Sequence, residues 1–128
     1  MTANELMIGD WMQHASGDYF KITRIDMWSD GSTHFACGHP HLWDYNNKFS
    51  SIPLTVEILE KIGFWYEQNV GYLMEEYEYE IIYNSWDHNL RILKNREQIL
   101  NLTYFDEMCV HELQHALRLC GINKEIEL

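Results

Sequence analysis

The middle of the chain reads SIPLTVEILEKIG, from Ser51 to Gly63. Thr55 can cap a helix that runs to Ile62, because a threonine oxygen at this position accepts a hydrogen bond from the unpaired backbone N–H groups of the first turn. Gly63 can end the helix, since the residue after the last turn often adopts a left-handed backbone. One face of this helix is apolar and carries Ile58, Leu59 and Ile62. The stretch therefore predicts a short helix between an N-terminal and a C-terminal part of the chain.

The N-terminal part carries short apolar stretches separated by turn residues. Alternation from Glu5 to Met12, the turn Ser16-Gly17-Asp18 and a second stretch from Tyr19 to Ile25 are typical of a hairpin. Further strands are expected from Thr33 to Cys37 and from Leu42 to Tyr45. Short strands joined by tight turns favour a small, curled β-unit that resembles an SH3-like barrel.

The C-terminal part is expected to hold antiparallel strands and a long helix. The run from Tyr72 to Asn84 alternates apolar residues with glutamates, which predicts a strand with one solvated face. Trp86 lies in an expected hairpin tip, and two strands follow it, at 90–94 and 98–102. Thr103 can cap a long helix from Tyr104 to Cys120. The fold class is thus α+β, and we expect a single domain over residues 1–128 with subunits 1–52 and 53–128.

A hydrophobic core is expected where the first strands meet the short helix. We expect that core to include Leu6, Ile8, Trp11, Phe20, Ile22 and Ile25 on the strands and Ile58, Leu59 and Ile62 on the helix. At 128 residues the chain is long enough to bury such a core without disulfides or metals.

Charge and cysteine content narrow the classes of function. The chain has 20 acidic and nine basic residues and a formal net charge of -11, which disfavours direct binding to nucleic acid. No apolar stretch approaches the roughly 20 residues that cross a bilayer, so no membrane span is expected. Three unevenly spaced cysteines and the lack of a signal peptide indicate a reducing compartment, the cytoplasm.

The expected C-terminal helix contains the pattern H-E-x-x-H. In zinc hydrolases two such histidines hold the metal and the glutamate acts as general base, so His111, His115 and Glu112 are the candidate residues. A catalytic zinc needs a third protein ligand, and the only carboxylates downstream are Glu125 and Glu127, within a few residues of the helix end. An upstream residue could also complete the set.

A helical wheel gives a second argument about this pattern. It places both histidines opposite the apolar face, which predicts a packed helix whose histidines lie in water. The apolar face consists of Phe105, Cys109, Val110, Leu113, Ala116, Leu117 and Cys120. The wheel thus favours a surface helix with no metal, and no cofactor is expected.

A second group of metal-ligating residue types lies in the N-terminal part. It consists of His34, Cys37, His39 and His41. The order C-x-H-x-H is not an established zinc spacing and has no partner pair elsewhere in the chain. An ordinary turn is therefore the preferred interpretation, with metal binding as the alternative.

Three motifs together resemble a family of short uncharacterised proteins of gut bacteria. They are ELMIGDW from Glu5 to Trp11, IPLTVEILEKIGF from Ile52 to Phe64, and VHELQHAL from Val110 to Leu117. Members resemble accessory genes of prophages and other mobile elements. Their last motif also occurs as V-H-Q-L-Q-N, so the resemblance implies that neither Glu112 nor His115 is obligatory. It implies no activity, substrate or cofactor.

The expected function is therefore that of a non-enzymatic accessory or protein-interaction module of a mobile element, with an unidentified protein partner. Exposed aromatic residues such as Trp86 and the absence of a complete catalytic set favour this class. One alternative is a minimal zinc hydrolase that uses the H-E-x-x-H pattern. Another is an acidic decoy that occupies the DNA site of a DNA-binding protein.

Overall fold

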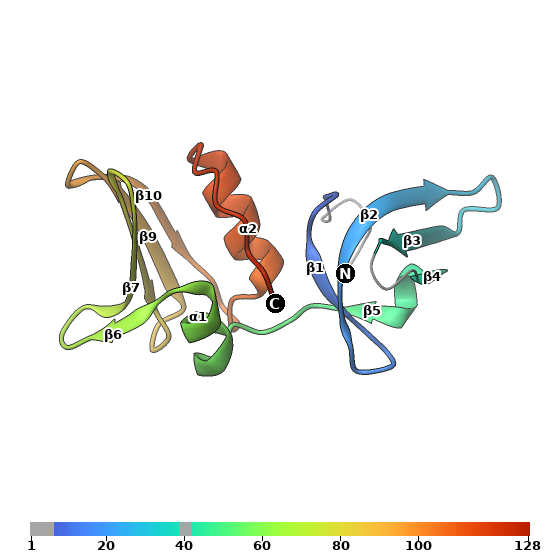
Figure 1. Cartoon of the computed structure of the whole chain (residues 1–128), viewed down its shortest axis with the longest axis horizontal. Coiled ribbons are helices and arrows are strands. Elements are labelled where there is room, and N and C mark those ends of the chain that lie inside the picture. The colour runs from blue at the N-terminus through green and yellow to red at the C-terminus, as the bar shows by residue number, and fades with distance from the viewer. Residues whose placement is uncertain (1–6, 39–41) are drawn as a thin grey trace. The chain divides into compact units, whose positions relative to one another are not determined.

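The computed structural model describes residues 7–38 and 42–128 and has the α+β class. The described residues form two antiparallel sheets of five strands each and two α-helices (Figure 1). The chain divides into two compact units, Met1–Ile52 and Pro53–Leu128. Each unit is described by itself.

The first unit is an antiparallel sheet with the strand order β4-β3-β2-β1-β5. Its strands are β1 (Trp11–His14), β2 (Tyr19–Met27), β3 (Thr33–Cys37), β4 (Leu42–Tyr45) and β5 (Phe49–Ser50). A single turn of 3-10 helix, Asn46–Lys48, joins β4 to β5. The end strands β4 and β5 do not pair with each other, so the described strands form an open sheet and not the closed barrel expected from the sequence.

The core of the first unit lies on one face of this sheet. It consists of Met12, Phe20, Ile22, Phe35, Cys37 and Phe49, with Ile25 and Leu42 packed against it. The prediction was right for Phe20 and Ile22 and wrong for Ile8, which precedes β1 in a turn and is 63% exposed. Leu6 lies outside the described residues. Alternation along the chain assigned Ile8 to a strand that begins only at Trp11.

The second unit is a meander with the strand order β10-β9-β8-β7-β6 and two helices. Its strands are β6 (Trp65–Glu67), β7 (Gly71–Glu76), β8 (Tyr79–Asn84), β9 (Asn89–Lys94) and β10 (Glu97–Thr103). The helices are α1 (Val56–Ile62) and α2 (Val110–Leu119). None of the helices in the described part of the chain has the length and apolar character needed to cross a bilayer.

Helix α1 has the bounds that the sequence predicted. The Thr55 hydroxyl accepts a hydrogen bond from the backbone N–H of Ile58 at 3.3 Å, and Gly63 follows the last turn with a φ of 125°. Ile58, Leu59 and Ile62 are buried, as expected from the wheel of this stretch. A side chain at Gly63 would contact Met74 of β7, so the end of α1 lies against the meander.

One face of the meander is buried across three strands. Met74, Ile81 and Ile92 are paired across β7, β8 and β9, and all three are fully or almost fully buried. Helix α2 lies beside this sheet in Figure 1 and buries Val110, Leu113, Ala116 and Leu117. The core of the second unit therefore forms between the helices and the sheet.

Two predictions about the second unit were wrong. The run from Tyr72 to Asn84 is not one strand, because Tyr77 adopts a φ of 53° in a turn that separates β7 from β8. The expected long helix is a helix of ten residues, since the chain continues in β10 through Thr103 and then runs irregularly to Cys109. The helix begins where the Glu112 side chain closes a capping box on the Cys109 N–H.

Candidate functional site

Helix α2 brings the two histidines of the H-E-x-x-H pattern together. The imidazoles of His111 and His115 lie one turn apart, with ring centroids separated by 5.6 Å and planes inclined by 73°. The carboxylate of Glu112 accepts a hydrogen bond from the Cys109 backbone N–H at 2.9 Å. This glutamate therefore serves the N-terminal cap of α2 in the observed geometry.

The wheel was wrong about the exposure of these histidines. His111 is only 7% exposed and the neighbouring Gln114 is equally buried, while His115 is half-buried. The prediction failed because a wheel assigns exposure from the polarity of the residues on a face, although polar residues on a helix can also be covered.

No third zinc ligand lies near this pair among the residues that the structure describes. In the described part of the chain no three His, Cys, Asp or Glu side chains are placed to share a metal ion. The downstream candidates Glu125 and Glu127 are exposed in the segment after α2. Helix α2 thus supplies two of the three protein ligands that a catalytic zinc needs, His111 and His115. The Glu112 carboxylate, the expected general base, is already hydrogen-bonded in the helix cap.

The second group of potential metal ligands does not come together, because His34 and Cys37 lie on opposite faces of β3. Cys37 points into the core of the first unit, and burial raises the pKa of its thiol to about 11. His34 is an odd number of residues away and points to the opposite face. His39 and His41 lie outside the described residues. His34 and Cys37 therefore cannot bind the same ion in this arrangement.

The outer face of the first sheet carries a cluster of aromatic rings around His34 that was not predicted from the sequence. We call Trp28, Trp43 and Tyr45, together with the His34 ring that they cover, the outer aromatic surface. His34 pairs with Tyr45 across β3 and β4, and Ala36 pairs with Trp43, so these side chains share a face. The alternation of Trp43 and Tyr45 along β4 is the sequence signal that could have revealed it.

The rings of this surface are in contact. The His34 ring is stacked on Trp43, with centroids 4.3 Å apart and planes inclined by 5°, and it lies 4.2 Å from the Tyr45 centroid and 4.6 Å from that of Trp28. The Trp28 and Trp43 centroids are 5.9 Å apart. These separations are typical of favourable aromatic packing, so the rings form one continuous platform.

The platform is open to solvent although the histidine beneath it is not. Trp28, Trp43 and Tyr45 each expose between 39% and 51% of their surface, whereas His34 exposes none. Neither ring nitrogen of His34 has a hydrogen-bond partner in the part of the chain that the structure describes. Buried polar groups are usually paired, so these two nitrogens are an exception, and the three rings contact the imidazole without forming a hydrogen bond to it.

Charged residues border the outer aromatic surface. Asp26 pairs with His34 across β2 and β3, and its carboxylate is 3.1 Å from the Arg24 guanidinium. In the turn before β3, the Ser32 hydroxyl and backbone N–H both donate to Asp30. These bonds lower the pKa of Asp30, and a smaller electrostatic contribution from His34 acts in the same direction.

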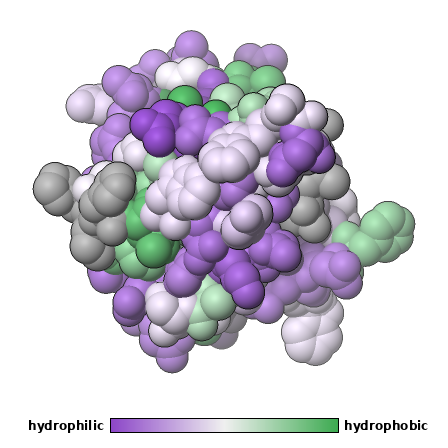
Figure 2. Space-filling view, turned by 90° about the vertical axis from the view of Figure 1, so that its right-hand side faces the viewer, coloured by the Kyte–Doolittle hydropathy of each residue, from purple (hydrophilic) through white to green (hydrophobic). Residues whose placement is uncertain are grey.

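The surface of this region is mixed in polarity. Figure 2 views the molecule from the side on which β2, β3 and β4 are drawn in Figure 1. Residues of intermediate hydropathy lie in the middle of the view, with hydrophilic residues over much of the surface around them and some hydrophobic residues on the left.

Comparison with other proteins adds no functional information. The chain matches no protein-family model, no curated protein and no solved structure. Function is therefore inferred from the chemistry of the described side chains.

Proposed function

We propose that the chain is a non-enzymatic accessory module of a mobile element that binds a basic segment of another protein. The observation that carries this proposal is the outer aromatic surface, in which three half-exposed rings lie side by side over a buried histidine. Tryptophan and tyrosine are enriched at the centres of protein interfaces, where they supply most of the binding energy.

The strand arrangement of the first unit supports a peptide-binding role. The order β4-β3-β2-β1-β5, with a 3-10 turn between β4 and β5, resembles that of an SH3-like unit. Some domains of that type dock extended peptides on aromatic side chains. Here Tyr45 ends β4 immediately before the 3-10 turn, and Trp28 lies in the turn after β2.

Charge complementarity identifies the chemistry of the partner. The net charge of -11 attracts basic surfaces and accelerates their association at low salt. An arginine or lysine side chain can also lie over the face of an indole or phenol ring, a contact worth about 0.5 to 2 kcal/mol. The partner segment is therefore expected to carry arginine or lysine beside apolar residues.

Two variants of the full chain test the proposal. The double substitution Trp28→Ala and Tyr45→Ala removes two rings of the surface, and Tyr77→Ala removes an exposed ring from the turn between β7 and β8. Captures from native lysate should yield a basic protein that binds wild type and Tyr77→Ala, binds the double variant at least tenfold more weakly, and dissociates as salt is raised. A partner that the double variant retains, or no specific partner at all, would refute the proposal.

The captured partner and the purified protein also test the two alternative functions. If the captured partner binds DNA and wild-type protein competes with that DNA, the chain is an acidic decoy of a DNA-binding protein. If purified protein instead contains one zinc per chain and hydrolyses peptides, then His111 and His115 hold the metal and Glu112 acts as the base of a minimal hydrolase.

A further inference from the structure

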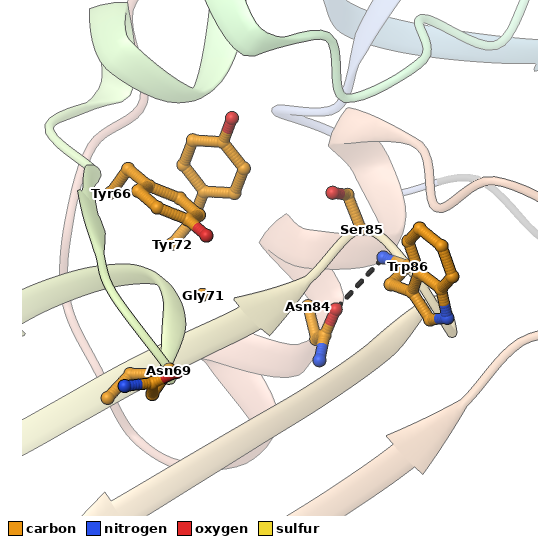
Figure 3. Close-up of a pocket in the computed structure, with 8 residues that line it drawn as sticks. Tyr66, Asn69, Gly71, Tyr72, Asn84, Ser85 and Trp86 are labelled. Carbon is orange, nitrogen blue, oxygen red and sulfur yellow. Dashed lines mark hydrogen bonds between the residues drawn. The ribbon is translucent and has the colours of Figure 1, made fainter.

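A pocket of about 310 Å³ lies at one end of the meander, and none of the residues that line it was discussed above as a metal ligand. It is open on one side and bordered by the turn between β6 and β7 and the turn that follows β8. The lining side chains belong to Tyr66, Asn69, Val70, Tyr72, Asn84, Ser85 and Trp86, together with Gly71 (Figure 3). This volume is at the lower end of the range for small-molecule sites.

The aromatic rings of the pocket lie on two sides of it. In the view of Figure 3 the rings of Tyr66 and Tyr72 are drawn on one side and the indole of Trp86 on the other, with Asn84 and Ser85 between them. The two tyrosine rings meet edge to face, with centroids 5.5 Å apart. Trp86 is 91% exposed, so both faces of its indole are accessible.

The polar groups of the pocket are available to a ligand. Asn84 uses its side-chain oxygen to accept a hydrogen bond from the Trp86 backbone N–H at 2.9 Å, which holds the turn that presents the indole. Among the described residues, no hydrogen bond is made by the Asn84 side-chain N–H₂, the Asn69 side chain or the Ser85 hydroxyl. Together these groups offer both donors and acceptors.

The composition of the pocket selects the charge of the ligand. None of the eight lining residues is Asp, Glu, His, Lys or Arg, although the chain has 20 acidic and nine basic residues. A charged ligand would lose hydration in this pocket without meeting an opposite charge. A wholly apolar ligand would leave the two asparagines and the serine without partners. The fitting ligand is neutral, carries several hydroxyl or amide groups, and has an apolar face.

We propose that this pocket binds a neutral carbohydrate, independently of the outer aromatic surface. A sugar ring has both required properties, because its C–H groups form an apolar face that packs against the electron-rich face of an aromatic ring. Its hydroxyl groups hydrogen-bond to side-chain amides and hydroxyls, such as those of Asn69, Asn84 and Ser85. The indole of Trp86 stacks on the ring, and the asparagines read the hydroxyl positions.

The test is a titration of the full chain with neutral oligosaccharides of glucose, mannose, galactose and N-acetylglucosamine. Binding is followed by the NMR signal of the Trp86 indole N–H and by amide signals of residues 66–72 and 84–86. At about 50 mM sugar, well above a Kd of about 1 mM, at least one oligosaccharide should shift these signals and saturate them. No saturable shift with any of the four would overturn the proposal.

Three variants locate the site. Trp86→Ala should weaken binding about tenfold, as expected for the loss of one stacking contact. Asn69→Gly should also weaken binding, and it removes the amide while keeping a residue that tolerates the φ of 68° at this position. Tyr77→Ala is the matched control, since Tyr77 is also 91% exposed in a turn of the same sheet and does not line the pocket.

The outcomes of the two experiments are separable. Loss of the basic partner in the Trp28 and Tyr45 variant tests only the outer aromatic surface, and sugar binding in that variant should equal that of wild type. If a neutral proline-rich peptide shifts the Trp86 signal and no sugar does, the pocket is a peptide site and the carbohydrate proposal is wrong.

Discussion

Truncation of Ile22 to alanine should destabilise the first unit by about 3 to 4 kcal/mol. Ile22 lies on β2 with none of its surface exposed, among the rings of the first core. The substitution removes three carbon atoms, and their transfer to water costs about 0.8 kcal/mol each, or about 2.4 kcal/mol in all. The remaining cost comes from the cavity, because the surrounding rings can close it only in part.

The measurement must report on the first unit, since the two units need not unfold together. We would follow hydrogen exchange of the amides of β2 and β3 in the native state and compare it with urea denaturation. The control is Ile8→Ala, the same truncation at a side chain that is 63% exposed. A change within about 0.5 kcal/mol at Ile22, equal to that of the control, would refute the register of β2.

Three further predictions concern the metal pattern, a glycine and a thiol. Purified protein should contain no stoichiometric zinc, and chelators should leave its thermal midpoint unchanged; one bound zinc per chain, lost in His115→Asn, would contradict this. Gly71→Ala should lower the denaturation midpoint, because Gly71 has a φ of 117° and an added Cβ would lie 2.9 Å from the Tyr83 carbonyl oxygen. An unchanged midpoint would show that β7 and β8 can shift apart at no cost and relieve this clash. Native Cys37 should resist iodoacetamide at pH 8 and react once urea unfolds the chain, because burial raises the pKa of its thiol to about 11. The raised pKa also means that the folded state loses stability as pH rises from the thiol's usual pKa of 9.0 toward 11, since in this range only the unfolded thiol ionises. Equal alkylation rates in folded and unfolded protein would show that this thiol is accessible.

The sequence correctly predicted the helices and strands whose start and stop signals lie close together in the chain. Helix α1 was correctly predicted because its cap at Thr55, its apolar face and its stop at Gly63 all lie in nine consecutive residues. The strands β3 and β4 were predicted with their observed bounds for the same reason, since turn residues flank each of them.

The errors arose where a distant partner outweighs a local signal. Thr103 has the chemistry of a helix cap, but it pairs with Asn89 at the end of β10, and a hydrogen bond joins their side chains. The burial of His111 could not be predicted either, since a wheel contains no information about what covers a face. Strand pairing brings Tyr45 to His34, and Trp28 joins them from the turn after β2, so the outer aromatic surface depends on contacts that sequence order alone does not give.

The candidate sites were predictable to different degrees. Exposure of Trp86 in a hairpin turn was expected and is confirmed. The remainder of the pocket was not, because Tyr66 and Tyr72 reach Asn84 and Ser85 only once β6, β7 and β8 are paired in register. Pairing across strands, and not composition, creates both proposed binding surfaces.

The meander of the second unit has a consequence for how the chain folds. Within residues 7–38 and 42–128, each strand from β6 to β10 pairs only with its neighbours in the sequence, so every pairing closes a loop of a few residues. In the first unit the pairing of β1 with β5 instead joins Gln13 to Ser50, so it closes a much longer loop and costs more chain entropy. Because folding is slowed by contacts between distant residues, the first unit should depend on a late, rate-limiting closure, whereas the meander can extend from any one of its hairpins as it emerges from the ribosome.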